Sequence, residues 1–210
     1  MKTDSIIFDL DGTLWNPLDA CVMAWNKTLQ QTGVENFTVT ADMVTGYMGK
    51  LLNDIIAAEY SFLSSSKQGE IAAVFAEQEK LHMHQYGGTL YPGVREALVD
   101  LSKKYKLCIV SNCLEGYIEN FLRQHQLAQF FTDFECIGNT GKPKSDNIGL
   151  IISRNNLANP VYLGDTMSDF NATNKNNIPF IFAAYGFGNV EEAEYRIEGL
   201  EELEGVVETI

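Results

Sequence analysis

Short apolar runs alternate with longer amphipathic stretches along most of the chain. The runs are rich in Ile, Val and Phe, and each lies near a Gly, Asp, Ser or Asn, which is typical of strands buried on both faces of a parallel sheet. The stretches between them have the length of crossover helices. The pattern predicts an α/β fold with a doubly wound parallel sheet. The expected strands are 6–9, 107–111, 134–137, 161–164 and 180–183, and the expected helices are 94–104, 116–125, 148–155 and 168–175.

One interval breaks this alternation. Between about residues 17 and 87, helical periodicity continues without a comparable strand, in segments 20–32, 41–46, 51–62 and 71–86. Tyr91-Pro92-Gly93 then marks the return to the alternating pattern. The sequence therefore predicts a discontinuous α/β core, residues 1–16 and 88–210, and an inserted all-helical domain, residues 17–87.

Acidic charge dominates the composition. The formal net charge is −13, and no block of Lys or Arg offsets it locally. Since such a chain repels nucleic acid and anionic lipid, we expect neither as a partner. Asp9 and Asp11 interrupt the first apolar run, so neither a signal-peptide core nor a membrane span is expected there. The four cysteines lack a Cys-x-x-Cys spacing, which argues against a zinc site or disulfides. We expect a soluble, cytoplasmic protein.

Two pairs of carboxylates follow predicted strands. Asp9 and Asp11 end the first strand on one side of the chain, where a divalent cation would offset their repulsion. Asp165 and Asp169 follow another strand at a spacing of about one helical turn. Either pair alone is also consistent with a turn or a helix cap. Because the carboxyl ends of parallel strands form the ligand site of such sheets, both pairs together predict an oxygen-rich Mg²⁺ site.

Two further segments offer groups that suit phosphate. Ser111 supplies a hydroxyl at the end of a strand, and Asn112 a backbone N–H near a helix start. The segment Gly141-Lys142-Pro143-Lys144 supplies a compact positive charge. Each alone is typical of a turn or a solvated loop, so the prediction of a phosphate site depends on the acidic pairs.

In their order and spacing these segments resemble the four motifs of the haloacid dehalogenase superfamily, in its phosphatase branch with a helical cap inserted after the first strand (a C1 cap). Phosphoglycolate phosphatases are the most similar in layout, and β-phosphoglucomutases share the motifs. The resemblance implies a Rossmann-like core. The matching segments are Asp9-Leu10-Asp11-Gly12-Thr13, Ser111-Asn112, Lys142-Pro143 and Gly164-Asp165-Thr166-Met167-Ser168-Asp169.

The resemblance implies a role for each motif residue. Asp9 attacks phosphorus and becomes an aspartyl phosphate, while Asp11 protonates the leaving oxygen and later activates water. Mg²⁺ is held by the side chains of Asp9 and Asp165 and the main-chain carbonyl of Asp11. Other residues assist: Asp169 supports the metal, Ser111 and Asn112 hold phosphoryl oxygens, and Lys142 neutralises charge, with Lys144 as the fallback.

The chain departs from the family pattern at two places. The third motif lacks its second proline, because Ser145 stands there. Trp15-Asn16-Pro17 replaces a small residue, Asp and Ser. Trp15 either lines the substrate entrance or packs under the cap, and we favour packing. In the cap, Lys50 either contacts an anionic part of the substrate or is simply exposed.

The predicted function is hydrolysis of a small phosphorylated metabolite, such as phosphoglycolate, a sugar phosphate or a nucleotide, by an Mg²⁺-dependent phosphatase. The alternative is a phosphosugar mutase, which returns the phosphoryl group to a bound sugar phosphate instead of water. A non-catalytic binding protein is disfavoured, because every motif acid and Lys142 is intact. A dehalogenase is disfavoured because it lacks an acid at the position of Asp11. The sequence predicts no oligomeric state.

Overall fold

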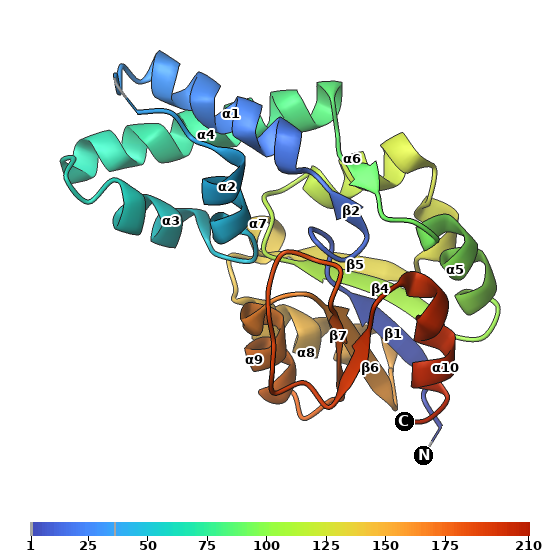
Figure 1. The fold of residues 1–210 in the computed structure, drawn as a ribbon. Coiled ribbons are helices and arrows are strands. Elements are labelled where there is room, and N and C mark those ends of the chain that lie inside the picture. The colour runs from blue at the N-terminus through green and yellow to red at the C-terminus, as the bar shows by residue number, and fades with distance from the viewer. Residues whose placement is uncertain (1, 36) are drawn as a thin grey trace. The chain divides into compact units, whose positions relative to one another are not determined.

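A parallel sheet organises the part of the chain that carries the four motifs. The computed structural model describes residues 2–35 and 37–210, and in these ranges six strands pair in the order β5-β4-β1-β6-β7-β8, every pair parallel. The prediction of a doubly wound α/β fold is confirmed (Figure 1). The strands are β1 (Ser5–Phe8), β4 (Lys106–Ser111), β5 (Asp133–Cys136), β6 (Pro160–Gly164), β7 (Phe180–Ala183) and β8 (Tyr195–Ile197).

Helices connect these strands. Helices α8 and α9 pack on β4 to β7, while α5 lies beside α10. A two-stranded antiparallel ribbon, β2 (Trp15–Asn16) with β3 (Thr89–Leu90), stands apart from the main sheet. The helices are α5 (Val94–Leu101), α6 (Tyr117–His125), α7 (Ile137–Thr140), α8 (Lys144–Asn155), α9 (Met167–Asn174) and α10 (Leu203–Val207), with 3-10 turns at Ala128–Phe130 and Leu200–Glu202.

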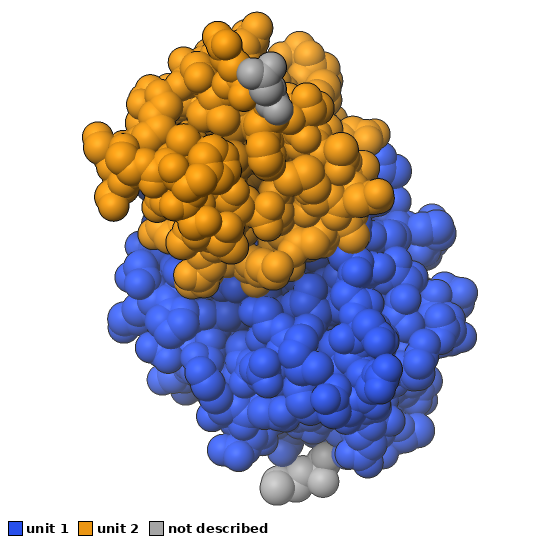
Figure 2. Space-filling model, turned by 60° about the vertical axis from the view of Figure 1, so that its left-hand side comes forward, with its two compact units in different colours: residues 1–16, 89–210 blue, residues 17–88 orange. Residues whose placement is uncertain are grey.

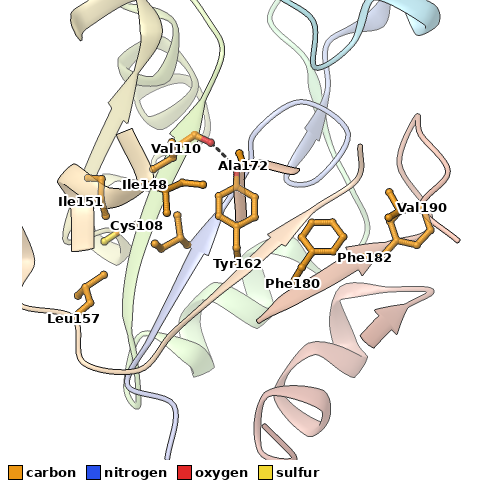
Figure 3. Close-up of a cluster of buried hydrophobic side chains, with 11 residues drawn as sticks. Cys108, Val110, Ile148, Ile151, Leu157, Tyr162, Ala172, Phe180, Phe182 and Val190 are labelled. Atoms are coloured by element: carbon orange, nitrogen blue, oxygen red, sulfur yellow. Dashed lines mark hydrogen bonds between the residues drawn. The ribbon is translucent and has the colours of Figure 1, made fainter. Parts of the chain in front are cut away.

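The core beneath α8 and α9 explains the apolar runs of the sequence. Ile7 of β1 lies in register between Cys108 of β4 and Tyr162 of β6. These residues form one buried cluster with Ile148 and Ile151 of α8 (Figure 3). All four residues of β1 are buried, since helices cover both faces of the sheet. Fully burying a side chain of this size contributes about 1.5–3 kcal/mol.

The chain divides into two compact units (Figure 2): residues 1–16 with 89–210, and residues 17–88. The return to the first unit thus lies one residue later than the sequence boundary at 87. In the second unit, the described residues 17–35 and 37–88 form helices and no strand. These are α1 (Leu18–Gln31), α2 (Ala41–Tyr47), α3 (Leu52–Glu59) and α4 (Ser65–Gln85).

Aromatic packing holds the second unit together. Helix α1 packs along α4, and Trp25 stacks on Phe75 with ring centroids 4.0 Å apart. Tyr47 and Tyr60 place their rings 5.6 and 6.0 Å from Trp25. Among the described residues of both units, no helix is both long and apolar enough to cross a membrane.

Candidate active site

The two acidic pairs lie at the point where the strand order reverses. From β1 the chain winds outward through β4 to β5, and then crosses back to place β6 on the other side of β1. Ligand sites of open α/β sheets occupy the carboxyl ends of the strands at such a switch point. Asp9 directly follows β1 and Asp165 directly follows β6, and the Asp9 N–H donates to the Leu163 carbonyl at 2.8 Å. Both carboxylates are buried.

A lysine joins the buried acids. Asp9, Asp165 and Asp169 each place a carboxylate oxygen within 4.8 Å of the others. The Lys144 ammonium donates to Asp9 Oδ1 at 2.8 Å and to Asp169 Oδ1 at 2.5 Å. The Lys144 side chain is only 3% exposed, so these ion pairs are shielded from water. Three carboxylates and one ammonium leave an excess of negative charge in this cluster.

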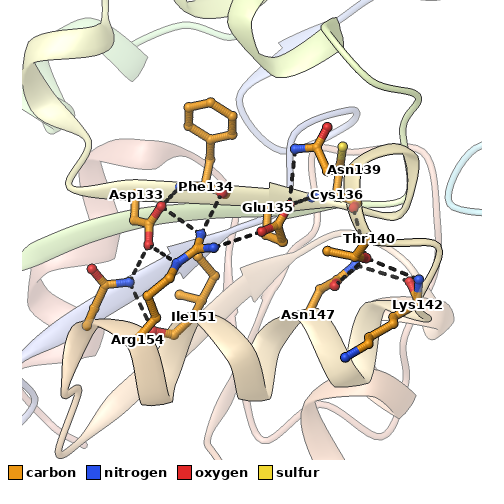
Figure 4. A network of polar contacts seen from close by, with 11 residues as sticks. Asp133, Phe134, Glu135, Cys136, Asn139, Thr140, Lys142, Asn147, Ile151 and Arg154 are labelled. Carbon is orange, nitrogen blue, oxygen red and sulfur yellow. Dashed lines mark hydrogen bonds and ion pairs between the residues drawn. The ribbon is translucent and has the colours of Figure 1, made fainter.

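The position of the lysine corrects the sequence analysis, which favoured Lys142. The Lys142 side chain is exposed, and Lys144 occupies the place beside Asp9. Pro143 is extended, with ψ 159°, and serves as the N-cap of α8, so Lys144 is the first helical residue. The Lys142 backbone is tied to the loop instead, since its carbonyl accepts from Asn147 Nδ2 and its N–H donates to Thr140 Oγ1 (Figure 4).

Asp169 serves Lys144 and the start of α9. Its Oδ1 accepts from Lys144 and lies 3.3 Å from the Tyr162 hydroxyl. Its Oδ2 accepts from the N–H and the hydroxyl of Thr166 at 3.0 and 2.6 Å, forming a capping box. Both oxygens of Asp169 are thus engaged within the protein, and the metal-supporting role that the sequence analysis expected stays a prediction.

Two glycines lie against Asp165: Gly12 of the first motif, and Gly186, which the sequence analysis did not single out. Asp165 Oδ2 accepts from the Phe187 N–H at 2.8 Å. A Cβ added at Gly12 would lie 2.1 Å from Asp165 Oδ2, and one at Gly186 2.3 Å from Asp165 Cβ. Any side chain at either position would displace the carboxylate. The pattern Gly186-Phe187-Gly188, shortly after a buried strand, was the available signal for this loop.

Burial and mutual repulsion shift the ionisation of these acids. Burial and the charge of Asp169 raise the pKa of Asp9 to about 7, although Lys144 opposes the shift. Burial, Asp169 and Asp9 raise the pKa of Asp165 well above its usual range. Burial alone would lower the pKa of Lys144, but Asp169 and Asp9 outweigh it and raise that pKa. A divalent cation would relieve the excess negative charge, and carboxylate oxygens are the donors that Mg²⁺ prefers, so the residues fit this ion.

Asp11 is held apart from this cluster. Its Oδ1 accepts from Trp15 Nε1 at 2.6 Å and from the Tyr117 hydroxyl at 3.0 Å. Burial raises the pKa of Asp11 to about 6 against the effect of these bonds. The sequence analysis favoured packing beneath the cap for Trp15. Its ring contacts are with Tyr117, Phe121 and His125 of α6, and neither its bond to Asp11 nor Tyr117 was foreseen.

The remaining candidates lie in different places. Ser111 ends β4, beside β1 in the sheet, and its side chain is buried. Asn112 follows it and is half-buried. Lys50 is exposed in the second unit, just after α2, and its N–H donates to the Tyr47 carbonyl. Its role stays a prediction.

Comparison with known proteins shows which family the chain resembles. Residues 6–183 match the family model of haloacid dehalogenase-like hydrolases. Phosphoglycolate phosphatases of Aliivibrio fischeri and Aquifex aeolicus are 25% and 28% identical, over 89% and 87% of this chain and 86% and 85% of theirs. A pyrophosphatase of Bacillus mycoides is 28% identical over 62% of this chain and 58% of its own.

Solved structures agree with this fold. A haloacid dehalogenase-like hydrolase from Streptococcus pneumoniae superposes with a TM-score of 0.85 at 23% identity, covering 97% of each chain. The family match includes Asp9, Ser111 and Asp165. The chain therefore belongs to the haloacid dehalogenase-like hydrolase family.

Proposed function

We propose that this chain is an Mg²⁺-dependent phosphatase that hydrolyses a small phosphate monoester through an aspartyl phosphate on Asp9. The observation that carries the proposal is the position of Asp9, which is buried at the switch point, accepts a hydrogen bond from Lys144 and lies close to Asp165. The names of the curated relatives support phosphoglycolate as the first substrate to try.

Asp9 is arranged to act as the nucleophile. Lys144 engages its Oδ1 at 2.8 Å, and we assign the attack on phosphorus to Oδ2. In the first displacement a bond forms between Asp9 and phosphorus, and the bond between phosphorus and the ester oxygen breaks. The Lys144 charge favours the ionised form of Asp9 and attracts a phosphoryl oxygen. Asp169 holds the ammonium in place from the other side.

Asp11 exchanges the proton in both half-reactions. It donates a proton to the departing alkoxide in the first displacement. In the second it takes a proton from water as the water attacks phosphorus, which releases inorganic phosphate and restores Asp9. The separation of Asp11 from Lys144 and Asp169 supports this division of labour, since its bonds to Trp15 and Tyr117 hold it elsewhere.

The metal is assigned to two acids of the cluster whose carboxylate oxygens lie within 4.8 Å of one another. The Asp9 and Asp165 side chains, with the main-chain carbonyl of Asp11, would hold Mg²⁺. Bound there, the ion supplies positive charge that reduces repulsion between the nucleophile and the phosphate. Ser111 and Asn112 are proposed to hold phosphoryl oxygens. Residues 17–88 are proposed to form the cap, with Lys50 contacting an anionic part of the substrate.

Phosphate release from 2-phosphoglycolate, measured with Mg²⁺ and with a chelator, tests the proposal. Asp9→Asn is expected to lower kcat at least about 1,000-fold, because the nucleophile is lost. Asp100→Asn, at an exposed acid of α5, is the matched control and should retain full activity. Quenching with ³²P-labelled substrate should trap a labelled protein only when Asp9 is present. Near-normal turnover by Asp9→Asn would refute the assignment.

The panel should include pyrophosphate and sugar phosphates. Pyrophosphate is the substrate that the name of the Bacillus mycoides relative indicates for that protein. A chain that interconverts sugar phosphates without releasing phosphate would be the mutase alternative. In that case the aspartyl phosphate would stand, and the acceptor in the second displacement would change from water to a sugar hydroxyl.

A further inference from the structure

The carboxylate of Asp11 receives two hydrogen bonds on one oxygen. Trp15 Nε1 and the Tyr117 hydroxyl both donate to Oδ1, at 2.6 and 3.0 Å. An indole N–H can only donate. Oδ1 has two lone pairs, and it can accept from both groups at once only when it carries no proton. Both observed bonds are therefore kept in the acid form of Asp11 when its proton is on Oδ2.

The two donors are held rigidly. Trp15 is fully buried, and its ring meets those of Tyr117 and Phe121 edge-on, with centroids 5.6 and 5.1 Å apart. Its backbone pairs with Leu90 in the β2–β3 ribbon. Tyr117 is 6% exposed and is the first residue of α6, after Gly116 at φ 85°. Neither donor can turn away from Asp11 without disturbing this packing.

We infer that Trp15 and Tyr117 are positioning residues, which fix the Asp11 carboxylate so that Oδ2 alone exchanges the proton with the leaving group and with water. The inference rests on the proposed function, in which Asp11 is the acid and base. A carboxylate that rotated would present Oδ1 and Oδ2 in turn and align the proton only part of the time. With Oδ1 fixed, the transferable proton stays on one side of the group.

The leaving group provides the test, since only a poor one needs the proton. An alkoxide, as from 2-phosphoglycolate, must be protonated as it departs, whereas 4-nitrophenolate departs without help. Tyr117→Phe and Trp15→Phe remove one donor each and retain an aromatic ring. We expect kcat/KM for 2-phosphoglycolate to fall about 10-fold to 100-fold, and that for 4-nitrophenyl phosphate about threefold or less. If Trp15 and Tyr117 had a purely structural role, their substitution would lower the two kcat/KM values equally.

Matched controls and a double variant sharpen the result. Tyr195→Phe on β8 and Trp25→Phe in the second unit should leave the ratio of the two kcat/KM values unchanged. In an Asp11→Asn background, Tyr117→Phe should have no further effect, because Tyr117 acts through the carboxylate. Tyr117→Phe keeps the buried ring, so it remains informative if Trp15→Phe fails to fold.

Failure of this inference differs from failure of the proposed function. Suppose that the wild-type chain releases phosphate through Asp9, but Tyr117→Phe lowers kcat/KM equally for both substrates or for neither. The positioning role is then overturned, and the phosphatase assignment stands. If Tyr117→Phe has its full effect in the Asp11→Asn background, the positioning role is likewise overturned. If the wild type releases no phosphate, or Asp9→Asn stays active, the proposed function itself falls.

Discussion

Two lysines, two positions apart in the third motif, have opposite environments. Lys144 is buried between Asp9 and Asp169, while Lys142 is exposed. We expect Lys144→Met to lower kcat/KM at least about 100-fold, because the charge beside the nucleophile is lost. Lys142→Met, the matched control, should stay within about twofold of the wild type. Steady-state kinetics on 2-phosphoglycolate measure both.

Folding must be checked in the same experiment. Removing one partner of a buried ion pair commonly costs about 3–5 kcal/mol, so circular dichroism should accompany the kinetics. Lys144→Arg keeps the charge and serves if Lys144→Met does not fold. A folded Lys144→Met with normal turnover, or an equal loss in Lys142→Met, would contradict this assignment.

The sequence identified the acids more readily than their partners. Asp9 and Asp165 could be placed together because each ends a recognisable buried strand, and such ends meet at one edge of a parallel sheet. Lys144 could not be chosen over Lys142, because the choice depends on where α8 begins. Tyr117 was missed because its contact with Asp11 spans 106 positions of sequence and involves no local pattern.

At the scale of elements, a polar network fastens α8 to β5. Arg154 of α8 donates to both oxygens of Asp133 at 2.7 and 2.8 Å and to Glu135 at 3.0 Å (Figure 4). Asn155 adds a bond to Asp133 at 2.6 Å. Burial would raise the pKa of Asp133, but the bonds from Arg154, Asn155 and the Phe134 N–H outweigh it and lower that pKa. The network fixes the helix whose first residue is Lys144.

This network should make stability depend on pH. Because the pKa of Asp133 is lower in the folded chain, its contribution is complete above the ordinary value of 3.8 and is lost as the pH falls through the folded-state value. We expect Asp133→Asn to lower the free energy of unfolding by about 1 kcal/mol at pH 7, where Arg154 is partly exposed and screened. The difference should be smaller near pH 2 than at pH 7.

Urea denaturation at the two pH values measures this effect. Asp100→Asn is the matched control, since Asp100 pairs with Lys103 at the surface and both side chains are about two-thirds exposed, at 64% and 65%. Its effect should be much smaller at pH 7. An Asp133→Asn deficit that persisted unchanged in acid would show that ionisation of Asp133 is not its cause.

Most elements followed from periodicity, and the exceptions have physical reasons. The sequence placed the start of α8 at residue 148, but the helix begins at Lys144, because Pro143 caps it and Asp146 and Asn147 continue it. Strand β8 was missed because it is only three residues long and includes the exposed Arg196. Its neighbours Glu194 and Glu198 are acidic, so the segment lacks the apolar run that marks the other strands.

At the scale of the whole molecule, the chain carries a net charge of −13, and three of its carboxylates lie together in the buried cluster. A cation that binds only the folded chain stabilises it, by about 2.7 kcal/mol at 100 times its Kd. We expect MgCl₂ to raise the Tm of the wild type more than NaCl at equal ionic strength does. Differential scanning fluorimetry measures this.

Mg²⁺ should decide which is the more stable protein, the wild type or the Asp165→Asn variant. Without Mg²⁺ the variant should be at least as stable as the wild type, because one of three crowded carboxylates becomes neutral. With Mg²⁺ the wild type should be the more stable, since the variant has lost a ligand. An equal rise in Tm for both would remove Asp165 from the metal site.

The two-stranded ribbon has a consequence for engineering. Asn16 and Thr89 are antiparallel partners, so the chain leaves the first unit and returns to it at adjacent points, about 4.5–5.5 Å apart. A two-residue turn could close that gap. Residues 17–88 could therefore be replaced by a shorter or foreign segment without changing the register of the main sheet. Substrate choice could then be redesigned separately from the catalytic residues.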